Sequence, residues 1–167
     1  MPRLENTALT PSRGAVADPA AVIELATGWA PRFTRCTEST LETLRARYAS
    51  FTPDGVERDD VLALFDRAEL PGEPSWIVLR RYQTGDYALP HRSRAELGGP
   101  AEQASWVVVC TLTESTVDGR TFWDGTRFVR VMDKAGYAVA TDPKAWCWTS
   151  PVRGRTRFTV TLGGRDA

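Results

Sequence analysis

The chain has 167 residues, of which 42% are hydrophobic and 25% are charged. A chain of this length buries roughly two-thirds of its unfolded surface, which allows one domain with a substantial core. Its 21 basic and 21 acidic side chains cancel, which argues against a nucleic-acid protein that binds through a global positive field. No apolar run approaches the roughly 20 residues of a membrane span, and the N-terminus lacks a signal-peptide layout. We therefore expect a cytoplasmic protein with neither a nucleic-acid nor a membrane partner.

Along the chain, the first part is expected to be helical. Residues 1–17 are polar without periodicity and are expected to form a flexible N-terminal segment. Three helices are expected next, and their capping or breaking residues lie at 18 and 28, 39 and 52, and 58 and 71. These helices would occupy residues 18–70 of one domain that spans 18–167.

After Pro74 the sequence consists of short runs rich in Val, Thr, Trp and Phe, separated by turn residues. Seven strands are expected, at 75–82, 105–113, 120–123, 128–131, 137–140, 145–149 and 155–162. Their close spacing predicts an antiparallel sandwich or barrel, and helices followed by strands give an α+β order. The polar segment Arg92–Gln103 is expected to be an exposed loop between strands, in a position where a lid would lie.

Few residues indicate chemistry when they are taken alone. His91 is the only histidine, and a lone histidine is more often structural than catalytic. Cys147 lies between two tryptophans, where a buried and inert thiol is the usual outcome. The three cysteines form no CxxC pair, so no zinc ribbon is indicated. Arg157 ends an alternating run of arginines whose shared face is either solvated or built to hold an anion.

Four segments resemble motifs of the prolyl-hydroxylase-like 2-oxoglutarate/Fe(II) oxygenases. Residues 81–91 (RYQTGDYALPH) resemble a Tyr-x-x-Gly-Asp-(aromatic) run that leads to Pro-His-x-Asp. Residues 118–122 (DGRTF) resemble the turn Gly-Gly-Glu-Thr-x-Phe, and 136–140 (GYAVA) resemble a Gly-(apolar) strand. Residues 147–158 (CWTSPVRGRTRF) resemble the closing His-x-x-x-Pro-Val-x-x-Gly-x-Arg-(Tyr/Phe) motif. The resemblance implies a double-stranded β-helix (a cupin-like jelly roll) over 75–163, with helices packed outside.

The departures from this pattern bear on the metal. The family holds Fe(II) with two histidines and one carboxylate, and here only His91 matches. Ser93 stands at the carboxylate position and Cys147 at that of the second histidine. No metal is therefore expected at His91, Ser93 and Cys147. His91 and Cys147 are instead expected on facing strands, where they would act as a catalytic acid–base and thiol pair.

The resemblance retains an anion-binding end. Arg157 matches the arginine that pairs with the distal carboxylate of 2-oxoglutarate, and its planar guanidinium suits a bidentate carboxylate contact. Tyr82 and Tyr87 are expected to line the same carboxylate-binding pocket. The competing interpretation of Arg157 is a salt bridge at the mouth of the barrel.

Three functions stay open at this point. The first is a tailoring enzyme that acts on a small carboxylate-bearing metabolite without a metal cofactor. The second is a non-catalytic binding module, favoured if Trp146 and Trp148 fill the pocket. The third is an atypical hydroxylase that uses Fe(II) and 2-oxoglutarate, with Asp86 or Glu96 as a further ligand. A small-molecule substrate is expected in the first and third cases, and a homo-oligomer formed through an exposed sheet edge stays open.

Overall fold

The computed structural model describes residues 11–12, 16, 18–36, 46–97, 103–123 and 125–166. It contains helices α1 (Pro19–Gly28) and α2 (Gly55–Leu62) and the 3-10 helices η2 (Ala30–Arg32), η3 (Arg67–Glu69) and η4 (Ser93–Leu97). The strands are β1 (Pro11–Ser12), β2 (Thr34–Cys36), β3 (Ala46–Phe51), β4 (Trp76–Tyr82), β5 (Tyr87–Arg92), β6 (Trp106–Thr111), β7 (Gly119–Trp123), β8 (Phe128–Met132), β9 (Ala138–Thr141), β10 (Trp146–Thr149) and β11 (Arg157–Gly164). Neither of the described helices has the length and apolarity that a membrane crossing requires.

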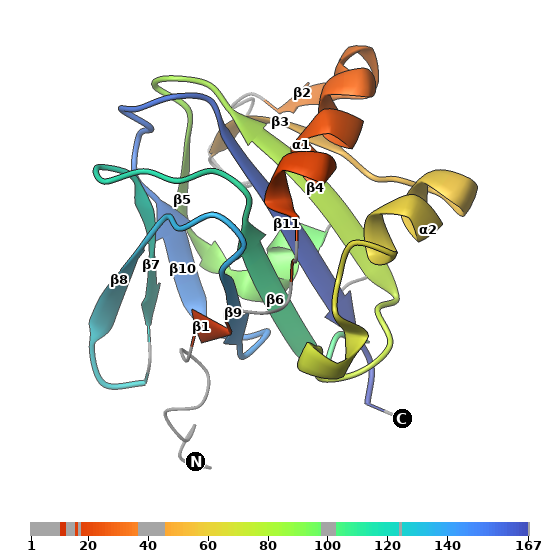
Figure 1. Cartoon of the computed structure of the whole chain (residues 1–167). Coiled ribbons are helices and arrows are strands. Elements are labelled where there is room, and N and C mark those ends of the chain that lie inside the picture. The colour runs from red at the N-terminus through yellow and green to blue at the C-terminus, as the bar shows by residue number, and fades with distance from the viewer. Residues whose placement is uncertain are drawn as a thin grey trace.

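The strands form one curled antiparallel sheet. They follow the order β1-β9-β6-β11-β4-β3-β5-β10-β7-β8, and β2 pairs with β3. Strand β3 connects the two halves, because residues 49–51 pair with β4 and residues 46–47 pair with β5. The sheet therefore folds over on itself, and α1 and α2 cover the outer face of β6, β11 and β4 (Figure 1). This arrangement confirms the predicted jelly roll with helices packed outside.

Local sequence signals explain the two α-helices. The Asp18 carboxylate accepts a hydrogen bond of 3.1 Å from the Ala21 amide, and Pro19 occupies the first turn, so α1 begins where it was predicted. The Asp54 carboxylate caps α2 through the Gly55 amide at 2.8 Å. That helix therefore begins three residues before the predicted start at Arg58.

The helix predicted from residue 39 is wrong at its C-terminal end. Residues 37–45 lie outside the described part, whereas residues 46–51 form β3. Ala46 and Tyr48 are buried and Arg47 between them is exposed, which is the alternation of a strand. The apolar spacing had suggested a helix, but pairing with β2, β4 and β5 decides the structure of this segment.

The segment Arg92–Gln103 is not wholly an exposed loop, which corrects that prediction. Residues 93–97 form η4, in which Ser93, Glu96 and Leu97 are buried, while 98–102 lie outside the described residues. A polar composition suggested exposure. Glu96 is buried because charged groups from other strands surround it, which its own segment does not reveal.

The seven predicted strands are present with boundaries shifted by up to two residues, and β1, β2, β3 and β5 were missed. Within the segment expected to be flexible, Pro11–Ser12 pair with β9 and Val16 is buried in the main core. The remaining residues of 1–17 lie outside the described part.

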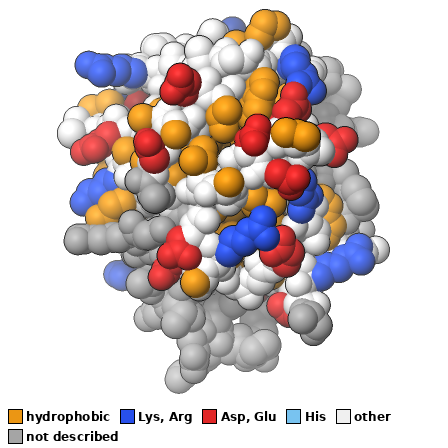
Figure 2. Space-filling view, turned by 45° about the vertical axis from the view of Figure 1, so that its right-hand side comes forward, with side chains coloured by type: hydrophobic (Ala, Val, Ile, Leu, Met, Phe, Trp, Pro, Cys, Tyr) orange, Lys and Arg blue, Asp and Glu red, His pale blue; other side chains and the backbone are white. Residues whose placement is uncertain are grey.

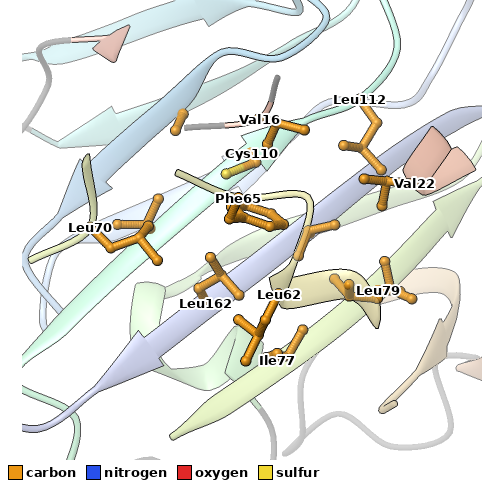
Figure 3. Close-up of a cluster of buried hydrophobic side chains, with 14 of the residues drawn as sticks. Val16, Val22, Leu62, Phe65, Leu70, Ile77, Leu79, Cys110, Leu112 and Leu162 are labelled. Atoms are coloured by element: carbon orange, nitrogen blue, oxygen red, sulfur yellow. The ribbon is translucent and has the colours of Figure 1, made fainter. Parts of the chain in front are cut away.

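The main apolar core lies between the sheet and the helices, outside the barrel. Ile77, Leu79 and Leu162 meet Leu62 and Phe65 there (Figure 3). Burying each such side chain contributes about 1.5–3 kcal/mol. The opposite face of β4 and β11 points into the barrel and is polar, with the buried residues Arg80, Tyr82, Arg157, Thr159 and Thr161. The interior of the barrel is therefore built for polar contacts.

Candidate functional site

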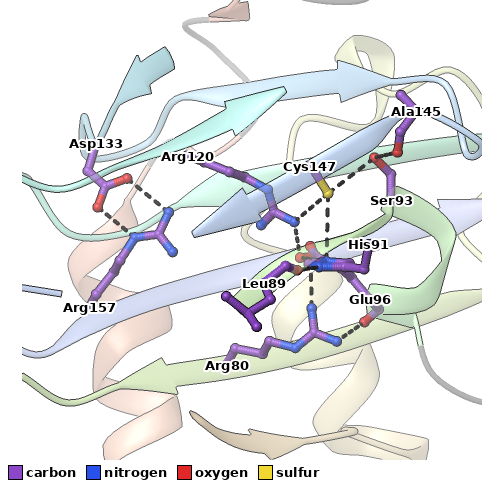
Figure 4. Close-up of polar contacts among 10 residues, drawn as sticks. All are labelled: Arg80, Leu89, His91, Ser93, Glu96, Arg120, Asp133, Ala145, Cys147 and Arg157. Atoms are coloured by element: carbon purple, nitrogen blue, oxygen red, sulfur yellow. Dashed lines mark hydrogen bonds and ion pairs between the residues drawn. The ribbon is translucent and has the colours of Figure 1, made fainter. Parts of the chain in front are cut away.

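Strands β5 and β10 bring His91 and Cys147 together inside the barrel. The two residues are direct cross-strand partners, and His91 Nε2 lies 3.6 Å from Cys147 Sγ (Figure 4). Both side chains are buried. The structure therefore places these two residues side by side, as the resemblance implied.

A buried carboxylate completes the contact from η4. Glu96 Oε1 lies 2.7 Å from His91 Nε2 and also contacts Arg120 Nη2. Glu96 Oε2 lies 3.3 Å from Arg80 Nη1, and Arg80 Nη2 donates to the Glu96 carbonyl oxygen. One glutamate therefore joins two arginines and the histidine (Figure 4).

Arg120, on β7, links the carboxylate to the thiol. Its Nη2 donates to Cys147 Sγ at 3.3 Å as well as contacting Glu96. Ser93 Oγ contacts the same sulfur at 3.6 Å and the Ala145 carbonyl oxygen at 3.3 Å. We call the following six residues, each at most 7% exposed, the charge cluster: Arg80, His91, Ser93, Glu96, Arg120 and Cys147.

The environment of Cys147 favours its thiolate. Burial raises the pKa of the thiol, but the Arg120 charge, the contact with His91 and the Ser93 hydrogen bond together outweigh burial and lower the pKa to about 6. Cys110 provides the contrast, since burial without such partners raises its pKa far above the usual value. At neutral pH, Cys147 is therefore mainly ionised while Cys110 stays protonated.

His91 contacts acceptor groups on both sides of its ring. Its Nδ1 lies 2.6 Å from the Leu89 carbonyl oxygen, and its Nε2 lies 2.7 Å from the Glu96 carboxylate. Carbonyl and ionised carboxylate oxygens only accept hydrogen bonds, so the ring is placed to donate to these atoms. Together with Arg80 and Arg120, His91 thus surrounds the Glu96 carboxylate with three hydrogen-bonding or ion-pairing nitrogens.

Several buried donors of the charge cluster remain unpaired within the described residues. They are Arg80 Nε and both Arg120 Nε and Nη1. Leaving a buried donor without an acceptor costs about 1–3 kcal/mol. Glu96 Oε2 also lacks a hydrogen bond within these residues, although it pairs with Arg80 at 3.3 Å. The three unpaired guanidinium donors make this part of the barrel suited to an anion.

The residues present do not fit a ferrous ion. One ligand atom each from His91, Glu96 and Cys147 lies within 4.8 Å of the others, a grouping typical of a metal site. However, the Arg120 guanidinium contacts two of those three atoms, the Glu96 oxygen and the Cys147 sulfur. A divalent cation there would be repelled by the Arg120 guanidinium, which already occupies contacts to two of the three ligand atoms.

The other predicted residues lie apart from the charge cluster. Arg157 forms a buried bidentate pair with Asp133, through Nε at 2.6 Å and Nη2 at 3.0 Å. Its Nη1 and the Tyr82 hydroxyl have no hydrogen-bond partner in the described part, and the guanidinium carbon lies 5.2 Å from the Tyr82 ring centre. Tyr87 is half-buried on β5. Carboxylate binding by Arg157, Tyr82 and Tyr87 stays a prediction.

The structure also decides between alternatives that the sequence left open. Of the two carboxylates considered as a further ligand, Glu96 lies beside His91 and Cys147, whereas both oxygens of Asp86 pair with Arg35 at 2.6 Å. Trp146 and Trp148 do not fill the barrel: Trp146 is 40% exposed beneath Arg92, and Trp148 packs on Phe128. Side chains alternate along a strand, so an inward Cys147 directs both tryptophans away from the interior.

Arg80 and Arg120 are the residues that sequence reasoning missed. In the segment 118–122, the arginine stands where the resembling motif has glutamate. This reversal of charge, at a position one strand away from Cys147, was a signal that the interior had changed its electrostatics. Arg80 carried no comparable signal, since a strand ending in Arg80, Arg81 and Tyr82 looks like an exposed end.

A surface hollow of about 500 Å³ lies between α1 and α2, lined by Leu25, Trp29, Asp60 and Leu64 among others. It shares no residue with the charge cluster. On the face that Figure 2 shows, acidic and basic side chains are interspersed, as the balanced composition implies.

Comparisons with known proteins show resemblance in structure only. No family model and no curated protein matches the sequence. A prolyl-4-hydroxylase from Pseudomonas putida superposes with a TM-score of 0.63 at 16% identity, covering 98% of this chain and 96% of that one. A 2OG-Fe(II) oxygenase family oxidoreductase from Burkholderia pseudomallei gives 0.64 at 12% identity, covering 96% and 86%. The non-heme α-ketoglutarate-dependent epimerase of nogalamycin biosynthesis gives 0.70 at 12% identity, covering 96% and 78%.

These likenesses extend over nearly the whole chain. Sequence identities this low support a shared fold but not a shared activity, which has to be inferred from the site itself. The chain has the fold of the prolyl-hydroxylase-like 2-oxoglutarate/Fe(II) oxygenases.

Proposed function

We propose that this domain binds a small carboxylate-bearing molecule inside its barrel and acts on it without iron, through Cys147 and His91. The observation that carries the proposal is the contact of Cys147 Sγ with His91 Nε2 at 3.6 Å, beside the Arg120 guanidinium. A thiolate next to an imidazolium is a nucleophile with its own proton donor.

The chemistry open to this pair is addition to an electrophilic carbon. The Cys147 sulfur forms a bond to the carbon of a carbonyl, and the π electrons move to the oxygen, which takes the proton from His91 Nε2. The reverse step returns the proton to His91 and releases the thiolate. Arg120 would hold a carboxylate of the same molecule through its unpaired Nη1.

A carboxylate panel tests the binding part of the proposal. Isothermal calorimetry with 2-oxoglutarate and succinate is expected to show saturable binding, whereas dimethyl succinate, which lacks the charge, is expected not to bind. Tyr82→Phe removes a buried hydroxyl that has no partner in the described residues, and should weaken succinate binding about five- to tenfold, the value of one hydrogen bond. Tyr137→Phe is the control, because the Tyr137 ring packs beneath Lys134 and contributes nothing to the charge cluster.

The catalytic part needs a second readout. The protein is incubated with 2-oxoglutarate, which carries a ketone carbon as well as two carboxylates, and its conversion to the covalent adduct on Cys147 is followed by mass spectrometry. Conversion that is lost in both Cys147→Ser and His91→Ala supports the proposed pair. Conversion that persists in both variants removes the pair from the mechanism.

A second candidate is a non-catalytic binding module. It is favoured by the enclosure of the charge cluster, where every member is buried and bonded to another member. Carboxylate binding without conversion, unchanged in Cys147→Ser, would select this candidate.

A further inference from the structure

The motif resemblance puts His91, Ser93 and Cys147 at the metal-ligand positions of the oxygenases, yet the charge cluster that contains them also holds two arginines. Arg120 contacts the Glu96 carboxylate and the Cys147 sulfur, and Arg80 contacts the other oxygen of Glu96. Those carboxylate and sulfur atoms are groups that a divalent cation would bind. The two guanidinium charges equal the charge of such an ion.

We propose that Arg120 is a built-in replacement for the metal ion, and that removing it converts the cluster into a metal site. The inference rests on the part of the proposed function that does without iron, and it names Arg120 as the group that excludes the metal. It does not depend on carboxylate binding, so failure of the calorimetric panel leaves it standing.

The spacing of the remaining groups supports the conversion. Zinc binds nitrogen at about 2.0 Å and thiolate sulfur at about 2.3 Å, so tetrahedral geometry sets the two ligand atoms about 3.5 Å apart. His91 Nε2 and Cys147 Sγ are already 3.6 Å apart. Glu96 supplies a third ligand from η4, and His91 Nε2 binds the ion after its proton is released to solvent. With Arg120 shortened, the negative charges of Glu96 and Cys147 lose their nearest cation and favour a divalent ion instead.

The orientation of the sulfur also fits this conversion. Ser93 Oγ contacts Cys147 Sγ and the Ala145 carbonyl, so it holds the sulfur from the side opposite Arg120 in Figure 4. Such contacts to a ligand atom orient it in metal sites. The orienting group would therefore survive the loss of Arg120.

Cobalt(II) titration tests the inference, because a cobalt–thiolate bond gives a charge-transfer absorption in the near ultraviolet. Arg120→Ala is expected to bind one equivalent of Co(II) with this absorption, at least about 100-fold more tightly than the wild type. Arg120→Lys keeps the cation and is expected to behave like the wild type. Arg120→Ala combined with Cys147→Ala is expected to lose the absorption.

Two results would overturn the inference. One is a wild-type protein that binds Co(II) through Cys147 as tightly as Arg120→Ala does. The other is a folded Arg120→Ala variant that shows no cobalt–thiolate absorption. If Arg120→Ala does not fold alone, zinc added during refolding is expected to restore its circular dichroism. The uncharged Arg120→Met variant then repeats the cobalt titration. Absence of both the zinc rescue and the cobalt–thiolate absorption counts against the inference.

Discussion

The two faces of β4 and β11 differ in the polarity of their buried side chains. On the outer face, Ile77, Leu79 and Leu162 pack under α1 and α2, and apolar burial stabilises the fold. On the inner face of the same strands, Arg80 and Arg157 are held by the carboxylates of Glu96 and Asp133. Alternation along a strand thus lets one element carry stability on one side and charge chemistry on the other.

The largest loss of stability is expected from removing the Glu96 carboxylate, which pairs with Arg80 of the inner face. Glu96→Ala leaves Arg80, Arg120 and His91 without their shared carboxylate, and should destabilise the fold by about 3–5 kcal/mol, as removal of one partner of a buried ion pair does. Urea unfolding measures the change. Glu114 is exposed, so Glu114→Ala serves as the control and should shift stability by less than about 0.5 kcal/mol. Equal effects of the two changes would contradict the role given to Glu96.

A cavity on the outer face should lower the free energy of unfolding by nearly as much, without changing the pKa of Cys147. Leu79→Ala removes a fully buried side chain from the main core and should destabilise by about 2–5 kcal/mol. The pKa of Cys147 should stay where it is, because Leu79 faces away from the barrel. A shift in that pKa would show that the two faces are coupled, against the comparison drawn above.

The pH dependence of stability sharpens the comparison further. The pKa of Cys147 falls to about 6 in the folded protein, below its value in the unfolded chain, so its contribution is present at high pH and is lost as pH falls toward 6. Wild type should therefore lose about 2 kcal/mol relative to Cys147→Ser between pH 8 and pH 5.5. Chemical denaturation at both pH values measures this difference, and parallel curves for the two proteins would refute it.

The smallest effect is expected at the inner hydroxyl groups. Thr161 Oγ1 is buried without a hydrogen-bond partner in the described residues. Thr161→Val replaces it with a methyl group, so stability should be unchanged or should rise by up to about 1 kcal/mol. Thermal unfolding checks this, and a clear loss would mean that the hydroxyl contributes a contact.

Local patterns predicted one helix start and seven of the strands, and the resemblance added the jelly-roll arrangement. Asp18 and Pro19 mark the helix start, continuous apolar runs mark β4 and β6, and alternation marks β11. It failed at β3, where pairing with three other strands overrides a helical spacing of apolar residues.

The site was predicted only in part, for a different reason. His91 and Cys147 could be placed on facing strands through the resemblance, and the structure makes them direct cross-strand partners of β5 and β10. The partners that set their charge come from η4, β4 and β7, far apart in the sequence, and burial of Glu96 depends on all of them. An exposed loop and a buried ion pair can have the same composition, so Glu96 was considered as a ligand from the sequence but its burial was not predicted.

The central claim is that a thiolate inside the charge cluster replaces the oxygenase metal centre. The most direct measurement is the ultraviolet thiolate absorbance of the wild type minus that of Cys147→Ser, followed as a function of pH. The account predicts an inflection near pH 6, the pKa of Cys147 in this environment. An inflection at pH 9 or above would mean that Arg120 and His91 do not stabilise the thiolate, and would contradict it.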